Sequence, residues 1–160
     1  MINMKIKNFK MQYYQEVLEL WKCTGIGISS SDTKEEIAKI LDRNPELFLI
    51  GKKGKKVIAV VIGAFDGRRG YVHHLAVDPN YQNKGYGKSI MDELIKRFQR
   101  KKVHKIHLFI EKHNIKVMNF YRKQGWEIRD DLIMMSYIPD KTLYRRSLDI
   151  KIDDKKNIDY

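Results

Sequence analysis

The residues best suited to chemistry are two glycines and two lysines at the point where a predicted strand gives way to a predicted helix. The segment reads Gln82-Asn83-Lys84-Gly85-Tyr86-Gly87-Lys88. Backbone amides that open a helix have no partner inside it and together carry about half a positive charge, so phosphate groups bind there readily. Gly85 and Gly87 allow positive φ and close approach of a ligand, and Lys84 and Lys88 add cations. The segment therefore predicts an anion-binding loop, although two glycines could also serve only to shape the turn.

The commoner phosphate loops do not fit this segment. A Walker-type loop would need a glycine at position 82, which is Gln82, and a dinucleotide-binding fingerprint would need one at position 90, which is Ile90. The loop alone therefore leaves the identity of the anion open.

Hydrophobic periodicity predicts the elements that would position this loop. They are a strand over 4–9, a helix over 12–22, a short helix opened by a capping box of Asp32 and Glu35, strands over 47–50, 57–65 and 71–77, a helix over 87–100, a strand over 106–110, a helix over 114–124, and two short strand-like runs within 126–138. This order predicts an α+β (α/β-like) domain around a mixed sheet. The strands over 71–77 and 106–110, which flank a helix, could be parallel.

Composition places limits on the class of protein. The chain has 160 residues, one cysteine and no run of about 18 apolar residues, which predicts a single cytoplasmic domain with no membrane partner. We expect residues 1–140 to form this domain and 141–160 a charged tail. The net charge of +12 fits a nucleic-acid binder, a protein that attracts a small polyanion, or a merely solvated surface. A nucleic-acid module is the least favoured, because the chain has no aromatic RNA-binding pattern, zinc knuckle or isolated basic helix.

The spacing Gln82-x-x-Gly85-x-Gly87 after Leu75-Ala76-Val77-Asp78-Pro79 resembles the acetyl-CoA loop of the GNAT superfamily of N-acyltransferases. A second segment agrees with that family's next helix, through Asn114, Val117, Phe120-Tyr121 and Gly125-Trp126. The resemblance covers roughly residues 4–138. Residues 47–77, with their Phe-Asp-Gly-x-Arg-Gly turn, are similar to a bacterial branch, the YpeA-like acetyltransferases. Val117 and Trp126 stand where alanine and phenylalanine are common, which could alter packing under the helix.

The resemblance implies a GNAT fold in which two parallel strands splay apart after a bulge and hold acetyl-CoA between them. It also implies direct transfer of an acetyl group to a primary amine in a ternary complex. No metal is expected, and a homodimer is possible. The residues implied to bind the cofactor are Leu75, Ala76, Val77, Gln82, Asn83, Lys84, Gly85, Tyr86, Gly87, Lys88 and Asn114.

The resemblance also implies roles in catalysis. The amide of Val77 would stabilise the oxyanion, and Tyr121 would protonate the departing thiolate as general acid. Without the family pattern, Tyr121 reads as an ordinary half-buried helix tyrosine.

The general base is left open. Strand alternation from Tyr71 predicts that His73, Leu75 and Val77 share its face and that His74 lies on the other. His73 is therefore one candidate for the base, Glu111 is a second, and a water chain is a third.

The acceptor is not named by the sequence. In this family, residues 21–33 and 128–137 would shape its site, and it could be a small-molecule amine or a protein amine. Asp32, Asp130 and Asp131 could attract a cationic amine or could be ordinary loop acids. A protein that binds acetyl-CoA without turnover is a further alternative, and the acyl group could be longer than acetyl.

Overall fold

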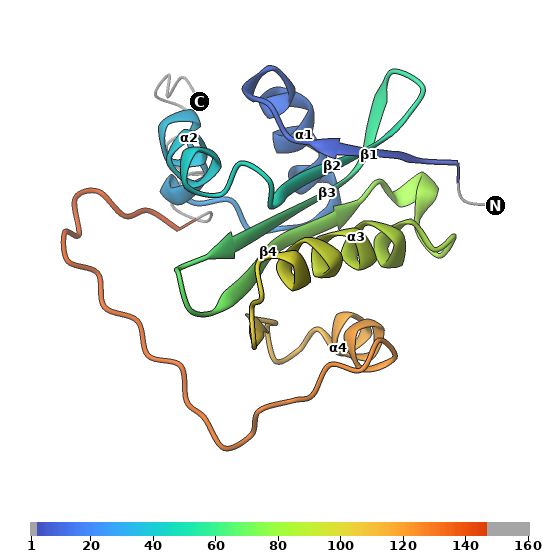
Figure 1. Ribbon diagram of the computed structural model, residues 1–160. Coiled ribbons are helices and arrows are strands. Elements are labelled where there is room, and N and C mark those ends of the chain that lie inside the picture. The colour runs from blue at the N-terminus through green and yellow to red at the C-terminus, as the bar shows by residue number, and fades with distance from the viewer. Residues whose placement is uncertain (1–2, 147–160) are drawn as a thin grey trace.

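The computed structural model describes residues 3–146, which form one five-stranded sheet with helices on both faces (Figure 1). The strands are β1 (Lys5–Asn8), β2 (Phe48–Lys53), β3 (Lys56–Phe65), β4 (Gly70–Val77) and β5 (Ile106–Leu108). The α-helices are α1 (Tyr14–Thr24), α2 (Lys34–Arg43), α3 (Tyr86–Arg100) and α4 (Ile115–Arg122). Short 3-10 turns cover Met11–Tyr13, Ser30–Asp32 and Pro79–Tyr81. The predicted α+β architecture around a mixed sheet is confirmed. No helix in the described part of the chain is long and apolar enough to cross a membrane.

The strands lie in the order β1-β2-β3-β4-β5. The first four are antiparallel neighbours, while β4 and β5 are parallel and are connected through α3, as the sequence predicts. Parallel neighbours need a crossover of this kind because the first strand ends at one end of the sheet and the second strand begins at the other. Residues 78–85, which include the 3-10 turn Pro79–Tyr81, connect the carboxyl end of β4 to the start of α3.

Each face of the sheet has its own apolar core. Alternate residues of β3 point to opposite faces, so Val60 and Ile62 pack under α1 and α2 while Ala59 and Val61 pack under α3. Trp21 is fully buried in the first core and Phe98 in the second. Figure 1 shows α1 and α2 on one side of the sheet and α3 and α4 on the other. The sheet therefore separates two layers of helices, each with its own apolar core.

The start of α2 differs from its prediction. The helix is capped by Thr33, whose hydroxyl accepts a hydrogen bond from the Glu36 amide at 3.4 Å. Asp32 lies in the preceding 3-10 turn, where its carboxylate accepts from the Ser29 amide at 2.8 Å. The predicted Asp32–Glu35 capping box is therefore wrong, because the serine three residues earlier competes successfully for the carboxylate.

The strand-like runs predicted within 126–138 are also wrong. Residues 127–146 contain no strand and run away from the sheet before returning beside α2 (Figure 1). Ile133 and Met135 are each 90 % exposed. A β-rich run becomes a strand only when a neighbouring strand pairs with it, and the edge strand β5 pairs only with β4 in the described chain. The segment ends against the α1–α2 loop, where the Ser30 amide donates to the Arg145 carbonyl at 3.1 Å. The part of the predicted charged tail beyond residue 146 lies outside the described residues.

Close approach of α3 to the sheet depends on Gly63. A Cβ atom at that position would lie 2.6 Å from the Leu94 side chain and 3.0 Å from the Leu47 carbonyl oxygen. The backbone carbonyl cannot move without disturbing β2. The contact fixes how α3 lies on β3, and with it the position of the loop that precedes α3.

We therefore expect Gly63→Ala to lower the free energy of unfolding by about 1–3 kcal/mol, because the added methyl overpacks this contact. Urea denaturation measures the change. Ala64→Ser, on the next residue of β3, should change stability by less than about 0.5 kcal/mol. A Gly63→Ala protein as stable as the wild type would show that α3 does not need this close approach.

Candidate active site

Part of β4 has no neighbouring strand in the described chain on the side that faces β5. Their pairing ends at Val72 opposite Leu108, yet β4 continues to Val77. Within the described residues, no strand pairs with positions 73–77 on that side. The expected divergence of the two parallel strands is confirmed, and it leaves a stretch of β4 backbone available to pair with an extended ligand.

A bulge in β4 accompanies this divergence. Val60 pairs with Ala76 and Ile62 pairs with His73, so the single residue Val61 lies opposite both His74 and Leu75. His74 adopts the left-handed region, with φ of 49°. One extra residue on one strand is the definition of a β-bulge, and it reverses the alternation of side chains that follow.

The reversal corrects the predicted faces of β4. Leu75 and Val77 pack on the α3 side, and they do not share a face with His73. His73 and His74 instead line one cavity on the α1/α2 side. The prediction that His74 lies opposite His73 is therefore wrong, because period-two alternation breaks at the inserted residue.

The end of β4 directs an amide toward the open edge. The Asp78 amide donates to the Ile58 carbonyl of β3 at 2.8 Å. Neighbouring residues of an antiparallel strand direct their polar backbone groups to opposite sides, so the Val77 amide and carbonyl point away from β3. The Val77 carbonyl accepts from the Gln82 side chain at 2.9 Å, which ties the following loop to the strand.

The loop after β4 opens directly into α3. Asn83 and Gly85 have positive φ values of 58° and 84°, and Gly85 caps the helix without a side-chain hydrogen bond. The first turn, Tyr86–Ser89, contains no acidic residue. Gly87 lies inside the helix without a positive φ, so the prediction that both glycines serve this conformation holds only for Gly85. The backbone amides in the first turn of α3 are therefore suited to bind an anion.

Polar contacts hold this loop in shape. Asp78 is buried, accepts from the Asn80 amide at 2.9 Å and pairs with Lys56 at 2.6 Å. That ion pair lowers the pKa of Asp78 below its usual value. Lys84 donates to the Asn80 carbonyl at 2.9 Å, and Lys88 pairs with Asp92 at 2.6 Å. The two lysines thus remain beside the loop, each with a partner.

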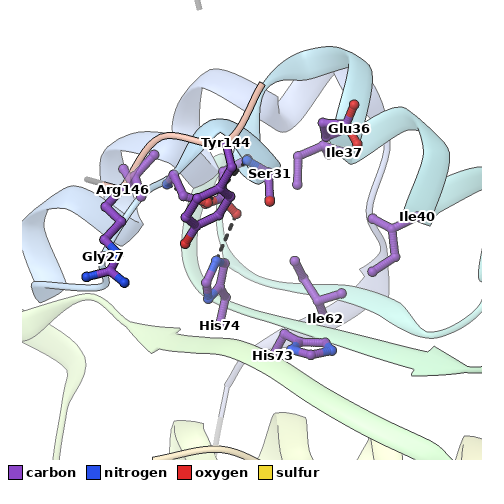
Figure 2. Close-up of a pocket in the computed structure, with 13 residues that line it drawn as sticks. Gly27, Ser31, Glu36, Ile37, Ile40, Ile62, His73, His74, Tyr144 and Arg146 are labelled. Atoms are coloured by element: carbon purple, nitrogen blue, oxygen red, sulfur yellow. Dashed lines mark hydrogen bonds and ion pairs between the residues drawn. The ribbon is translucent and has the colours of Figure 1, made fainter. Parts of the chain in front are cut away.

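A cavity of about 470 Å³ lies on the α1/α2 side of the bulge (Figure 2). Its volume falls in the range of small-ligand sites, about 300–1,000 Å³. The lining residues are Gly27, Ile28, Ser29, Ser31, Asp32, Glu36, Ile37, Ile40, Ile62, His73, His74, Tyr144 and Arg146. The cavity combines an apolar wall of isoleucines with carboxylates and two imidazoles. Part of the segment expected around the acceptor, residues 27–32, therefore does line a cavity at β4.

One short polar contact in this cavity joins His74 to Asp32. The His74 Nε2 atom lies 2.8 Å from Asp32 Oδ1, as the dashed line in Figure 2 marks. Asp32 is only 5 % exposed, and its other carboxylate oxygen accepts from Ser29. The Trp21 indole contacts the His74 ring edge-on, with 5.0 Å between ring centroids. Sequence reasoning missed this pair, because no periodic signal brings residue 32 to residue 74.

His73 lies in the same cavity in a different setting. Its burial lowers the pKa of the imidazole below the ordinary value, and neighbouring His74 lowers it further, while Asp32 opposes this. The ring is therefore neutral at neutral pH. Within residues 3–146, its side chain has no hydrogen-bond partner.

Tyr121 lies on the opposite face of the sheet, in the core under α3 and α4. It is 6 % exposed and makes edge-on contacts with Phe120 and Trp126. Burial raises its pKa well above the ordinary value, so the hydroxyl keeps its proton at neutral pH. Asn114 caps α4 by accepting from the Val117 amide at 3.3 Å.

Glu111 is not brought to the cavity. Its side chain is 78 % exposed and lies 3.1 Å from His113. It is absent from the residues that line the cavity on the other face. Of the two predicted bases, the structure therefore places only His73 beside a pocket.

Comparison with known proteins bears on this arrangement. The Acetyltransferase (GNAT) family model matches residues 14–126. Among curated proteins, an acetyltransferase of Sodalis glossinidius (strain morsitans) is 27% identical over 132 residues, covering 82% of this chain and 93% of that protein. An acetyltransferase of Yersinia pestis (strain Pestoides F) is 27% identical over 131 residues, with the same coverage.

Solved structures share the fold. A PaiA N-acetyltransferase from Thermoplasma acidophilum in complex with coenzyme A aligns with a TM-score of 0.72 and 21% identity, over 81% of this chain and 92% of that one. A GNAT-family acetyltransferase from Streptococcus pneumoniae TIGR4 aligns with a TM-score of 0.68 and 27% identity, over 88% and 100%. With the family model covering most of the sheet, the diverging strands and the loop before α3, this chain belongs to the GNAT family of acetyltransferases.

Proposed function

We propose that this protein transfers an acetyl group from acetyl-CoA to a primary amine held in the cavity beside β4. The observation that carries the proposal is the unpaired edge of β4 over residues 73–77, which lies between the loop that precedes α3 and a cavity lined by histidines. Each part suits one part of the reaction: an extended thioester arm, its phosphates and an acceptor. The coenzyme A complex of the Thermoplasma acidophilum neighbour supports the same donor.

The donor would use backbone groups more than side chains. Leu75, Ala76 and Val77 would pair with the pantetheine arm as a neighbouring strand does. The amides from Asn83 to Lys88 would bind the pyrophosphate at the start of α3, where no carboxylate competes in the first turn. Gln82 would act indirectly, since its side chain already binds the Val77 carbonyl. Asn114 would also bind the cofactor, from the start of α4.

The acetyl transfer itself would proceed directly between donor and acceptor. The amine, once it has lost a proton in the cavity, attacks the thioester carbonyl, and the Val77 amide stabilises the oxyanion. The carbon–sulfur bond breaks and Tyr121 protonates the thiolate, a role that its retained proton permits. His73 lies where it could take a proton from the amine, whereas Glu111 would need a chain of waters to reach the cavity.

The acceptor would be an amine with an apolar portion. Ile37, Ile40 and Ile62 offer an apolar wall, and Asp32 and Glu36 give the cavity carboxylates that favour a cation. Both a small molecule and the terminus of a protein fit this description. The single cysteine is in keeping with a cytoplasmic enzyme.

We expect Gly87→Glu to weaken acetyl-CoA binding by about 100-fold, because a carboxylate at the start of α3 repels the pyrophosphate. Isothermal titration calorimetry measures the dissociation constant. Gly87→Ala should keep the fold, because its Cβ would meet Phe120 at 3.4 Å, an ordinary contact. Gln99→Glu is the charge-matched control, since it adds the same charge at the far end of α3 and should leave affinity unchanged. Equal acetyl-CoA affinity for Gly87→Glu and Gln99→Glu would show that the pyrophosphate does not bind at this loop.

We expect Tyr121→Phe to lower kcat by about 10²-fold or more while acetyl-CoA affinity stays within about twofold, because only the proton donor is lost. Release of the CoA thiol measures turnover. Tyr13→Phe, on the other face of the sheet, should retain wild-type kcat. Full turnover by Tyr121→Phe would assign the proton donor to another group.

A further inference from the structure

We propose that His74 is the general base of the amine acetylation and that Asp32 is the positioning residue that makes it one. This inference rests on the proposed function and adds to it a residue and a partner. It starts from the contact between His74 Nε2 and Asp32 Oδ1, at 2.8 Å, on the wall of the cavity.

The contact fixes which ring nitrogen can accept a proton. The Asp32 carboxylate can only accept, and its second oxygen already accepts from the Ser29 amide at 2.8 Å. The Nε2 atom therefore donates in the His74–Asp32 hydrogen bond, and Nδ1 is the ring nitrogen that can take up a proton. Serine hydrolases also use a buried carboxylate to orient their general-base histidine, but there the carboxylate binds Nδ1, so the two ring nitrogens exchange roles here.

Burial and packing hold the pair in place. Asp32 is 5 % exposed, so its charge is screened little by solvent and acts mainly on its neighbour. The edge-on contact with Trp21 restrains the second side of the imidazole. The His74 side chain is still 27 % exposed, which leaves it accessible from the cavity.

The backbone of His74 gives independent support. A non-glycine residue in the left-handed region is strained, and such residues concentrate at functional sites. Here the strain has a visible result, because it turns His74 onto the cavity face at the point where β4 leaves β5. The imidazole is thus placed beside the unpaired edge along which the thioester would lie.

His73 fits the role less well than His74. Burial and the neighbouring imidazole both lower its pKa, which weakens it as a base, and it has no carboxylate partner within residues 3–146. The other ionisable groups that line the cavity are Glu36, Tyr144 and Arg146. Glu36 pairs with Lys39 at 2.5 Å, and both side chains are exposed, so this carboxylate has a partner other than the two histidines.

The proton balance follows. The ammonium group of the acceptor gives one proton to His74 Nδ1, which passes it to solvent, and the freed lone pair forms the bond to the acetyl carbon. The carbon–sulfur bond breaks, and its electron pair goes to sulfur, which takes a proton from Tyr121. The second proton leaves the new amide nitrogen and restores Tyr121 through solvent. The products are the acetylated amine, the CoA thiol and one proton.

Chemical rescue tests the assignment. Phenethylamine, spermidine, L-lysine and a peptide with a free amino terminus serve as acceptors, and the one that the wild type acetylates fastest is used for all variants. We expect His74→Gly to lower kcat by about 10²-fold or more. Added imidazole should restore turnover in this variant and leave the wild type unchanged. Glycine suits the positive φ at position 74, and His74→Asn, which also tolerates it, should be equally slow without responding to imidazole.

Matched variants separate the base from its surroundings. His104→Gly removes an exposed histidine outside the cavity and should retain wild-type turnover. Acetyl-CoA affinity should be unchanged in every variant, which shows that each is folded. Turnover by His74→Gly near the wild-type rate would overturn the proposal, as would imidazole rescue of His73→Ala in place of His74→Gly. If the wild type acetylates none of the four amines, the proposed function fails, and this assignment fails with it.

A double-mutant cycle tests Asp32. We expect Asp32→Asn to lower kcat about tenfold or more, because the amide no longer fixes the Nε2–H tautomer. Since the two side chains would act as a unit, the double variant should be no slower than His74→Gly within about threefold. If the loss of kcat in the double variant equals the product of the two single losses, Asp32 has only a structural role.

Discussion

One extra residue in β4 sets the geometry of everything around it. Because two residues of β4 lie opposite Val61 alone, the side chains that follow change faces, and β5 is not paired with β4 beyond Val72. The left-handed conformation of His74 costs about 1–3 kcal/mol. The hydrogen bond to Asp32 and the packing against Trp21 offset part of this cost. The bulge is thus held by Asp32, which lines the cavity, and by the buried Trp21 beside it.

The bulge also divides the site between the two faces of the sheet. His73 and His74 open onto the α1/α2 side, whereas Leu75, Val77 and Tyr121 belong to the core under α3 and α4. The unpaired backbone of β4 is the element common to both. In the proposed reaction, the donor along that edge would meet the acceptor from one face and the proton donor Tyr121 from the other.

Sequence patterns predicted the parts of this arrangement that repeat along the chain. All five strands and four helices of the described chain overlap their predicted positions, because period-two and period-3.6 patterns extend over several residues. The family resemblance implied a bulge, but apolar periodicity did not place it, since a single inserted residue leaves the pattern on both sides intact and only shifts its phase. The His74–Asp32 pair was missed because no periodic pattern brings residue 32 to residue 74. The cap at α2 was misassigned because Asp32 accepts from the Ser29 amide instead. The runs within 126–138 failed because β propensity cannot supply a pairing partner.

The different environments of Tyr121 and of the two cavity histidines set the direction of proton transfer in the proposed reaction. In the proposed reaction, Tyr121 cannot serve as a base at neutral pH, because burial raises its pKa and keeps the hydroxyl protonated. The imidazoles lie in a cavity that is open to solvent, and His73 is held neutral by burial. In the proposed reaction, a proton would therefore leave the amine on the cavity side, and the sulfur would be protonated from the α4 side. The sheet would keep these two proton transfers on opposite faces.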